Sequence, residues 1–153
     1  MLYIVLLLQR RGLEDAQPVL EESILSMKMM QCKTFCIADL GCSSGPNALL
    51  PADHIIKTLA AKYLAAGNIP LPQIQVFFND LPSSDFNTLF RALPPLLVTD
   101  HRNEATGVGA ARSYFAAGVA GSFYGRLFPD KSLHFVHSSY GLHWLSQVCF
   151  HNI

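Results

Sequence analysis

The sequence carries little charge of either sign. Only 14% of its 153 residues are Asp, Glu, Lys or Arg, and eleven basic side chains balance eleven acidic ones. A nucleic acid or an anionic membrane is recognised through a basic surface, so neither is expected as a partner, and a small neutral molecule fits better. Half of the residues are apolar, which excludes global disorder and predicts one domain with a core.

A metal-binding cysteine pattern is missing as well. The four cysteines, Cys32, Cys36, Cys42 and Cys149, form no C-x-x-C pair, and no further ligand cluster completes a tetrahedral zinc site around Cys32 and Cys36. We therefore predict reduced, mostly buried thiols, with neither a metal nor a disulfide among them.

The chain also lacks an apolar run of the ~20 residues that span a bilayer. Residues 1–8 are apolar, but Gln9, Arg10 and Arg11 follow this run instead of preceding it, and no small-residue cleavage site is present. The segment is expected to be a buried strand or the start of a helix, in a cytoplasmic protein.

What the sequence does contain is an alternation of strand and helix patterns. Apolar residues at helical spacing, from Ala16 to Met27, predict an amphipathic helix over residues 13–30, which Pro18 restarts or kinks. Glu21 and Glu22 would then face solvent. Short apolar runs predict strands over residues 35–39, 74–78, 114–118 and 133–137. Further helices are expected over residues 52–66, 123–128 and 142–148. Another helix is expected to begin at a cap formed by Ser83 or Ser84 and to end at residue 93, and residues 99–113 are expected to form a surface loop.

This alternation predicts an α/β protein with an open, mostly parallel sheet of the Rossmann type. In such a sheet the ligand binds beyond the carboxyl ends of the strands. Three of the predicted strands end in small or polar residues, namely Asp39, Asp80 and the run Ser138-Ser139-Tyr140. We expect these residues to face one crevice.

A glycine-rich turn follows the first strand, where Gly41 and Gly45 let backbone N–H groups approach a ligand. Its G-x-S-x-G spacing is not the G-x-G-x-x-G of dinucleotide enzymes, and Asp80 lies further along than the usual ~20 residues, which disfavours a nicotinamide oxidoreductase. Ser43 in a nucleophile elbow is the esterase alternative, disfavoured because no Asp and His follow in the required order. Asp80 is either a ribose acceptor or simply a cap.

Four segments, in order, resemble the SABATH family of plant S-adenosylmethionine-dependent carboxyl methyltransferases of the salicylate, benzoate and jasmonate type. The segments are Ile37-Ala-Asp-Leu-Gly-Cys-Ser-Ser-Gly-Pro-Asn47, Phe78-Asn-Asp-Leu-Pro with Asp85-Phe-Asn87, Gly121-Ser-Phe-Tyr-Gly-Arg-Leu-Phe-Pro129 and His137-Ser-Ser-Tyr-Gly-Leu-His-Trp-Leu-Ser-Gln-Val148. The resemblance implies a Rossmann-like class I methyltransferase fold, cut off after about the fourth strand. It also implies methyl ester formation on a small plant carboxylic acid.

The resemblance assigns roles to single residues. It implies S-adenosylmethionine as the methyl donor, with Gly41 in the donor-binding turn, Asp39 and Asn47 at the methionine end, Asp80 and Leu81 at the ribose, and Ser122 and Phe123 at the adenine. Gln9, Tyr140, His143 and Trp144 would line the acceptor pocket, although core packing is the simpler interpretation of Phe123 and Trp144 taken alone. Because a carboxylate with a pKa of ~4 is already ionised, no general base is required and no catalytic residue is assigned.

The sequence departs from the family pattern at both ends. Val5 and Leu6 stand where the family has Asn and Ser, and nothing after Val148 matches. Residues 1–33 are therefore expected to form an N-terminal segment and helix, residues 34–148 a partial donor-binding domain, and residues 149–153 a divergent tail. The acidic and asparagine residues that the family associates with magnesium are missing, so no metal site is expected.

Two functions stay open. The chain belongs to a carboxyl methyltransferase lineage, or it is a truncated, non-catalytic remnant that binds the donor, dimerises or pairs with a full-length relative. Whether it is an enzyme is left open, because the resemblance covers less than half of a family enzyme. An open apolar sheet edge would make such a chain marginally stable or prone to self-association.

Overall fold

The computed structural model describes residues 2–45, 47–67, 69–96 and 113–139. A four-stranded sheet runs through these residues in the order β3-β2-β1-β4, and every neighbouring pair of strands is parallel. The strands are β1 (Thr34–Leu40), β2 (Gln73–Asp80), β3 (Tyr114–Ala120) and β4 (Phe135–His137). This order confirms the predicted Rossmann-like α/β architecture, because parallel neighbours joined by helical crossovers produce it.

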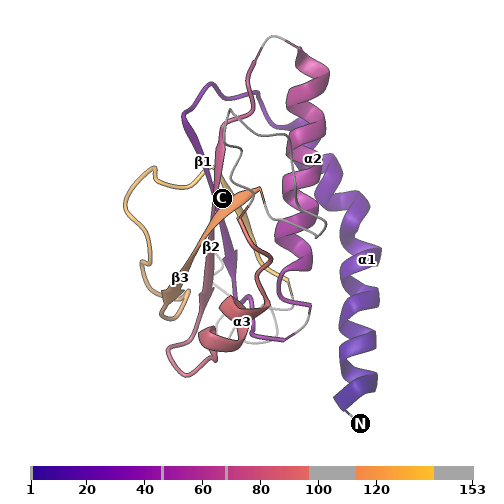
Figure 1. The fold of residues 1–153 in the computed structure, drawn as a ribbon, viewed down its shortest axis with the longest axis vertical. Coiled ribbons are helices and arrows are strands. Elements are labelled where there is room, and N and C mark those ends of the chain that lie inside the picture. The colour runs from indigo at the N-terminus through magenta and orange to yellow at the C-terminus, as the bar shows by residue number, and fades with distance from the viewer. Residues whose placement is uncertain (1, 46, 68, 97–112, 140–153) are drawn as a thin grey trace, which may run out of the picture.

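Within the described ranges three helices accompany the sheet: α1 (Leu2–Ser26), α2 (Leu50–Ala66) and α3 (Phe86–Ala92). Figure 1 shows α2 lying along one face of the sheet, with α1 beside α2. The predicted end of α2 is confirmed, since Gly67 ends the helix with a left-handed φ of 70°. The helix begins at Leu50, two residues before the predicted start, so that Pro51 lies in its first turn.

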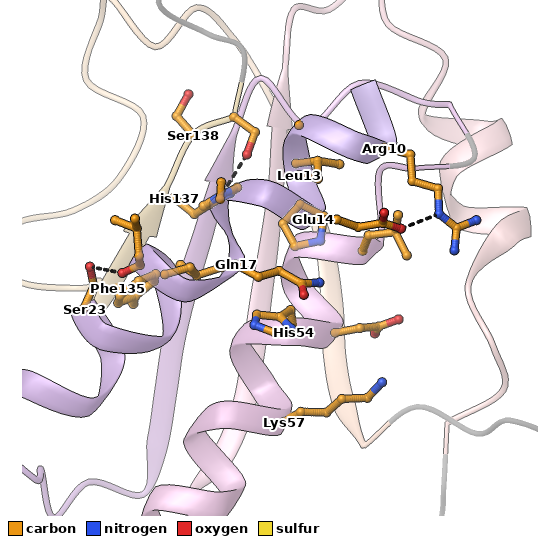
Figure 2. Close-up of a pocket in the computed structure, with 18 of the residues that line it drawn as sticks. Arg10, Leu13, Glu14, Gln17, Ser23, His54, Lys57, Phe135, His137 and Ser138 are labelled. Carbon is orange, nitrogen blue, oxygen red and sulfur yellow. Dashed lines mark hydrogen bonds and ion pairs between the residues drawn. The ribbon is translucent and has the colours of Figure 1, made fainter. Parts of the chain in front are cut away.

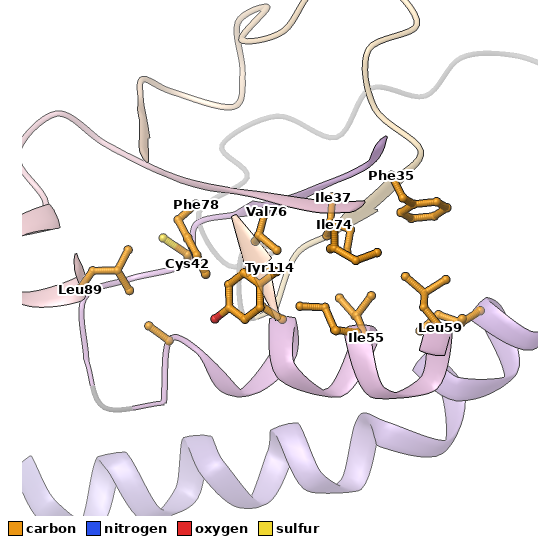
Figure 3. Packing of buried hydrophobic residues seen from close by; sticks show 14 of the residues in the cluster. Phe35, Ile37, Cys42, Ile55, Leu59, Ile74, Val76, Phe78, Leu89 and Tyr114 are labelled. Atoms are coloured by element: carbon orange, nitrogen blue, oxygen red, sulfur yellow. The ribbon is translucent and has the colours of Figure 1, made fainter. Parts of the chain in front are cut away.

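The core lies between the sheet and α2. Alternate residues of β1 and β2, such as Phe35, Ile37, Val76 and Phe78, point at Ile55 and its neighbours on α2 (Figure 3). All five side chains are almost fully removed from solvent. At roughly 1.5–3 kcal/mol for each large apolar side chain, this layer is the main source of stability and fixes the register of the strands that carry the site.

The C-terminal half of helix α1 is attached to α2. Ile24 is fully buried, and the Lys62 ammonium group of α2 donates to the carbonyl oxygens of Ile24, Leu25 and Met27, which end the helix. The helix begins earlier than predicted and ends at Ser26 instead of residue 30. It continues through Pro18, and Ala16 is exposed instead of packed. The expected exposure of Glu21 and Glu22 is confirmed.

Three predictions of local structure were wrong. Asp85, not Ser83 or Ser84, caps α3, because its carboxylate accepts hydrogen bonds from the Thr88 backbone and hydroxyl, and these bonds lower the pKa of Asp85. Residues 123–128 form turns and not a helix. Strand β4 begins later than predicted. The Cys36 N–H donates to Nδ1 of the His134 side chain at 3.0 Å, and so does not form a backbone hydrogen bond of the sheet there.

Other predictions lie outside the described residues. These are the helix over 142–148, Cys149, and the loop over 99–113 except for its last residue. No helix in the described ranges is both long and apolar enough to cross a membrane.

Candidate donor-binding site

The carboxyl ends of the strands bring the predicted polar residues to one edge of the sheet. In the parallel register, Asp39 of β1 lies opposite His137 of β4, Leu40 lies opposite Asn79 of β2, and Asp80 lies opposite Ala120 of β3. Residues two apart on a strand share a face, so Asp39 and Asp80 lie on the face that carries the core and the helices. The predicted convergence of strand ends is therefore found in the structure.

The turn after β1 is held against β2 by backbone hydrogen bonds. Gly41 and Ser43 both adopt left-handed backbone conformations, with φ of 72° and 62°. The N–H groups of Gly41 and Cys42 donate to the Asn79 carbonyl oxygen at 2.9 Å each, and the Ser43 N–H donates to Asp80 Oδ2 at 2.7 Å. A glycine at position 41 removes the steric cost of this conformation, and the turn presents its backbone at the sheet edge.

Asp80 joins the turn to the end of β2. Its Oδ2 accepts from Ser43, and its Oδ1 accepts from the Leu81 N–H at 2.7 Å. A carboxylate has about four acceptor positions, so both oxygens retain a lone pair for a further donor. The side chain is half-buried. Leu81, the next residue, has half of its surface exposed (51%).

Asn79 is a site residue that the sequence reading missed. It is fully buried, and its amide nitrogen donates to the carbonyl oxygens of Val119 and Gly121 at 2.8 and 2.9 Å. Since its own carbonyl accepts from the turn after β1, this one residue links three strand ends. A polar side chain at a buried strand position was the signal available in the sequence.

Asp39 is the most enclosed acid of the site. Its Oδ1 is 2.8 Å from His137 Nδ1, and His137 Nε2 is 2.8 Å from the Ser139 hydroxyl. Only 4% of the Asp39 side chain and 14% of the His137 side chain are exposed. Burial raises the pKa of Asp39, whereas the hydrogen bond and charge of His137 act in the opposite direction. Ser139 was expected at the crevice as part of a polar strand end, whereas His137 was not predicted as a site residue.

Phe123 brings the segment after β3 to the same turn. A side-chain carbon at Gly41 would lie 3.6 Å from Phe123 Cε1, so the ring lies next to the glycine. Phe123 is also in tilted contact with Tyr124, with ring centroids 5.4 Å apart, and the Ser122 hydroxyl accepts the Tyr124 N–H at 3.3 Å. The half-buried ring offers a flat apolar face near the turn, and Ser122 is exposed.

Cys42 lies close to both acids, and the reactivity of its thiol provides a test of this geometry. Burial, together with the negative charges of Asp39 and Asp80, raises the pKa of the Cys42 thiol far above its usual range. Cys32 and Cys36 are less enclosed free thiols. We expect iodoacetamide at pH 8 to label Cys32 and Cys36 well before Cys42 in the native protein, because only a thiolate reacts. Peptide mapping by mass spectrometry measures this order, and equal labelling of all three would contradict the described turn.

A cavity of about 800 Å³ opens beside this site and not within it. It is bounded by α1 from Arg10 to Ser23, by the first turns of α2, and by the end of β4, where His137 and Ser139 form part of its wall (Figure 2). Asp80, Gly41 and Phe123 do not line it. No group of three or more His, Cys, Asp or Glu residues within the described ranges could hold a metal ion.

Most of the sequence matches a known family. Residues 7–151 fit the family described as SAM dependent carboxyl methyltransferase. The chain belongs to this family. It is 46% identical over 143 residues to the salicylate carboxymethyltransferase of Clarkia breweri, and 52% identical over 114 residues to the indole-3-acetate O-methyltransferase 1 of Arabidopsis thaliana.

A solved family member shares the fold. The structure of a loganic acid methyltransferase with SAH (S-adenosylhomocysteine) superposes with a TM-score of 0.74 at 40% identity, and covers 92% of this chain. The present chain spans 37% of that protein and 37% of the Clarkia enzyme, and 29% of the Arabidopsis enzyme. The predicted SABATH carboxyl methyltransferase relationship is thereby confirmed.

The structure brings some of the predicted site residues together and leaves others apart. Asp39, Gly41, Asp80 and Phe123 come together around the turn after β1. Leu81 directly follows Asp80, and Ser122 directly precedes Phe123. Asn47 is half-buried between that turn and α2, where its carbonyl accepts the Leu50 N–H at 3.2 Å. Tyr140, His143 and Trp144 lie outside the described residues, and Gln9 belongs to α1.

Proposed function

We propose that this chain binds S-adenosylmethionine at the carboxyl edge of the sheet and serves methyl transfer to the carboxylate of a small plant acid. One observation carries the proposal: two carboxylates, Asp39 and Asp80, flank a left-handed glycine turn that also contacts the Phe123 ring. Cationic, hydroxyl-bearing and flat aromatic parts of one ligand would find complementary groups there.

The donor fits the chemistry of these residues. The ammonium group of its methionine end suits Asp39, an almost fully enclosed carboxylate whose Oδ2 accepts no hydrogen bond from a described residue. The ribose hydroxyls suit the free lone pairs of Asp80 next to Leu81, and the adenine suits the Phe123 face with Ser122 at its edge. Asn47 and the backbone of Gly41 complete the set.

Methylation of an acid needs positioning more than proton transfer. The donor supplies a sulfonium methyl group, and an acceptor carboxylate with a pKa of ~4 is ionised at neutral pH. The protein therefore has to hold the carboxylate oxygen in line with the methyl carbon and to exclude water. We assign the acceptor contacts to Gln9, Tyr140, His143 and Trp144, by their place in the family pattern.

The relatives suggest the acceptor class. Salicylate, jasmonate, indole-3-acetate and loganic acid appear in the names of the similar enzymes, and all are small carboxylic acids. We propose an acceptor of the salicylate, benzoate or jasmonate type.

Calorimetric titration with S-adenosylhomocysteine tests the donor site. We expect saturable binding by the full chain. Asp80→Asn should lower the affinity about 10- to 100-fold, because an amide nitrogen cannot accept a hydrogen bond from a ribose hydroxyl. Asp15→Asn, on the exposed side of α1, is the matched control and should bind as the wild type does. No binding by a folded wild-type protein would overturn the proposal.

A second candidate is a chain that binds the donor without completing methyl transfer and pairs with a full-length relative. The exposed side chains of Phe115 on β3 (45%) and Val136 on β4 (52%), the two edge strands of the described sheet, favour it. Light scattering of the chain alone and mixed with a full-length relative would show a mixed complex. A methyl-transfer assay with salicylate, benzoate and jasmonate then separates the two candidates.

A further inference from the structure

We propose that His137 and Ser139 are positioning residues for the amino group of the donor. Ser139 holds the His137 ring in place, and His137 orients Asp39 so that the second carboxylate oxygen, Oδ2, accepts from the donor's ammonium group. The inference rests on the proposed function, because it assigns to residues at the end of β4 a task in binding the same donor.

The sheet builds this chain of contacts. Parallel pairing of β1 with β4 places Asp39 directly opposite His137, so the carboxylate and the imidazole share one face and meet at 2.8 Å. Ser139 follows two residues later and reaches the far nitrogen of the same ring at 2.8 Å. His137, which is labelled in Figure 2, and Ser139 both line the cavity beside the site.

The direction of each hydrogen bond follows from the groups involved. An ionised carboxylate can only accept, so His137 must donate through Nδ1–H. In the neutral ring Nε2 then carries a lone pair, and the Ser139 hydroxyl donates to it. Loss of the Ser139 hydroxyl would leave Nε2 without this hydrogen bond, so the imidazole ring, and with it Asp39, would be held less firmly in place.

The surroundings of Asp39 explain why it needs such support. Three titratable groups face it from the packed elements: His137 from β4, Asp80 from β2 and the Cys42 thiol from the turn. Burial and the negative charge of Asp80 raise the pKa of Asp39, and the contacts with His137 lower it. Removal of His137 therefore favours the protonated acid, which offers less to a cation.

Two variants of His137 separate positioning from folding. His137→Gln removes the donor at the Nδ1 position, whereas His137→Asn keeps an N–H there. We expect His137→Gln to weaken S-adenosylhomocysteine binding about tenfold or more at pH 7, the value of a lost hydrogen bond to a charged group. His137→Asn should recover most of this loss. For His137→Gln the pH below which binding is lost should rise, because the contacts with His137 lower the pKa of Asp39.

A second ligand shows whether the variants weaken binding of the amino acid part of the donor alone. 5′-Methylthioadenosine has the ribose and the adenine but no amino acid, so its affinity should stay within about twofold of wild type in both variants. Ser139→Ala should weaken S-adenosylhomocysteine in the same selective way and Ser139→Thr should not. Ser138→Ala is the matched control, because the Ser138 hydroxyl donates to the Leu40 carbonyl and not to His137.

The outcomes are distinguishable. If the wild-type chain binds neither ligand, the proposed function fails, and this inference fails with it. If the wild type binds but His137→Gln weakens both ligands equally, or neither, the proposed function stands and His137 has only a structural role. Circular dichroism of each variant reports folding, and Ser139→Ala, the smaller change, decides the question if His137→Gln does not fold.

Discussion

Replacing Asn79 by Asp is expected to cost at least about 3 kcal/mol in the free energy of unfolding at pH 7. The change keeps the shape of the side chain but replaces an amide donor by a carboxylate. The fully buried group would then face two carbonyl oxygens, those of Val119 and Gly121, which now accept its N–H bonds at 2.8 and 2.9 Å. Both carbonyls would lose their partner next to an unpaired buried charge.

Urea unfolding followed by circular dichroism measures this cost. The same substitution at Asn87, an exposed residue in the first turn of α3, is the matched control, and it should change stability by less than about 0.5 kcal/mol. The loss at position 79 should shrink at lower pH, because a protonated carboxyl can donate one hydrogen bond. Equal stability of the two variants would show that Asn79 does not join the strand ends.

The main features of the fold could be predicted from local patterns. The buried strands β1 and β2 are short apolar runs that end in acids, and α2 has its proline and glycine at opposite ends. These signals are local, because burial on both faces and helix termination depend on residues close in sequence. The predicted positions of Asp39, Gly41 and Asp80 followed from the strand ends alone.

The structural features that local sequence patterns did not predict depend on contacts between residues far apart in the sequence. Residues 123–128 have an apolar, helix-like pattern, yet they form turns in which Phe123 meets Gly41, 82 positions earlier in the chain by number. His137 becomes a partner of Asp39 only through pairing of β4 with β1, which separates the two residues by 98 positions. Pairing partners of parallel strands leave no mark in a local window.

The two acids of the site differ in environment and so in the work they can do. Asp80 is half-buried and receives two backbone N–H bonds, which hold it in place without enclosing it. Asp39 is enclosed, and one of its oxygens depends on a histidine from the edge strand. The first arrangement suits neutral hydroxyl groups, and the second suits a cation that can compensate a buried negative charge.

Replacing Asp39 by Asn is therefore expected to stabilise the free protein while abolishing donor binding. Burial raises the pKa of Asp39 above its ordinary value, because the carboxylate is more costly to ionise in the folded state than in the unfolded chain, where water solvates it. The asparagine side chain keeps an oxygen that can accept from His137 but carries no charge. We expect a gain of roughly 1 kcal/mol or more at pH 7, together with the loss of measurable S-adenosylhomocysteine binding.

The stability gain of Asp39→Asn over the wild type should depend on pH. Below the unfolded pKa of ~3.9 the carboxyl is protonated in both states and contributes no difference. Between that value and the raised folded pKa, the folded state binds more protons than the unfolded state, so the stability of the wild type falls as pH rises. The advantage of Asp39→Asn should therefore grow from about pH 4 upward and level off above the folded pKa. Urea unfolding of both proteins between pH 4 and pH 8 measures it, and a wild type more stable than Asp39→Asn at pH 8 would mean that the pairing with His137 outweighs the burial of the charge.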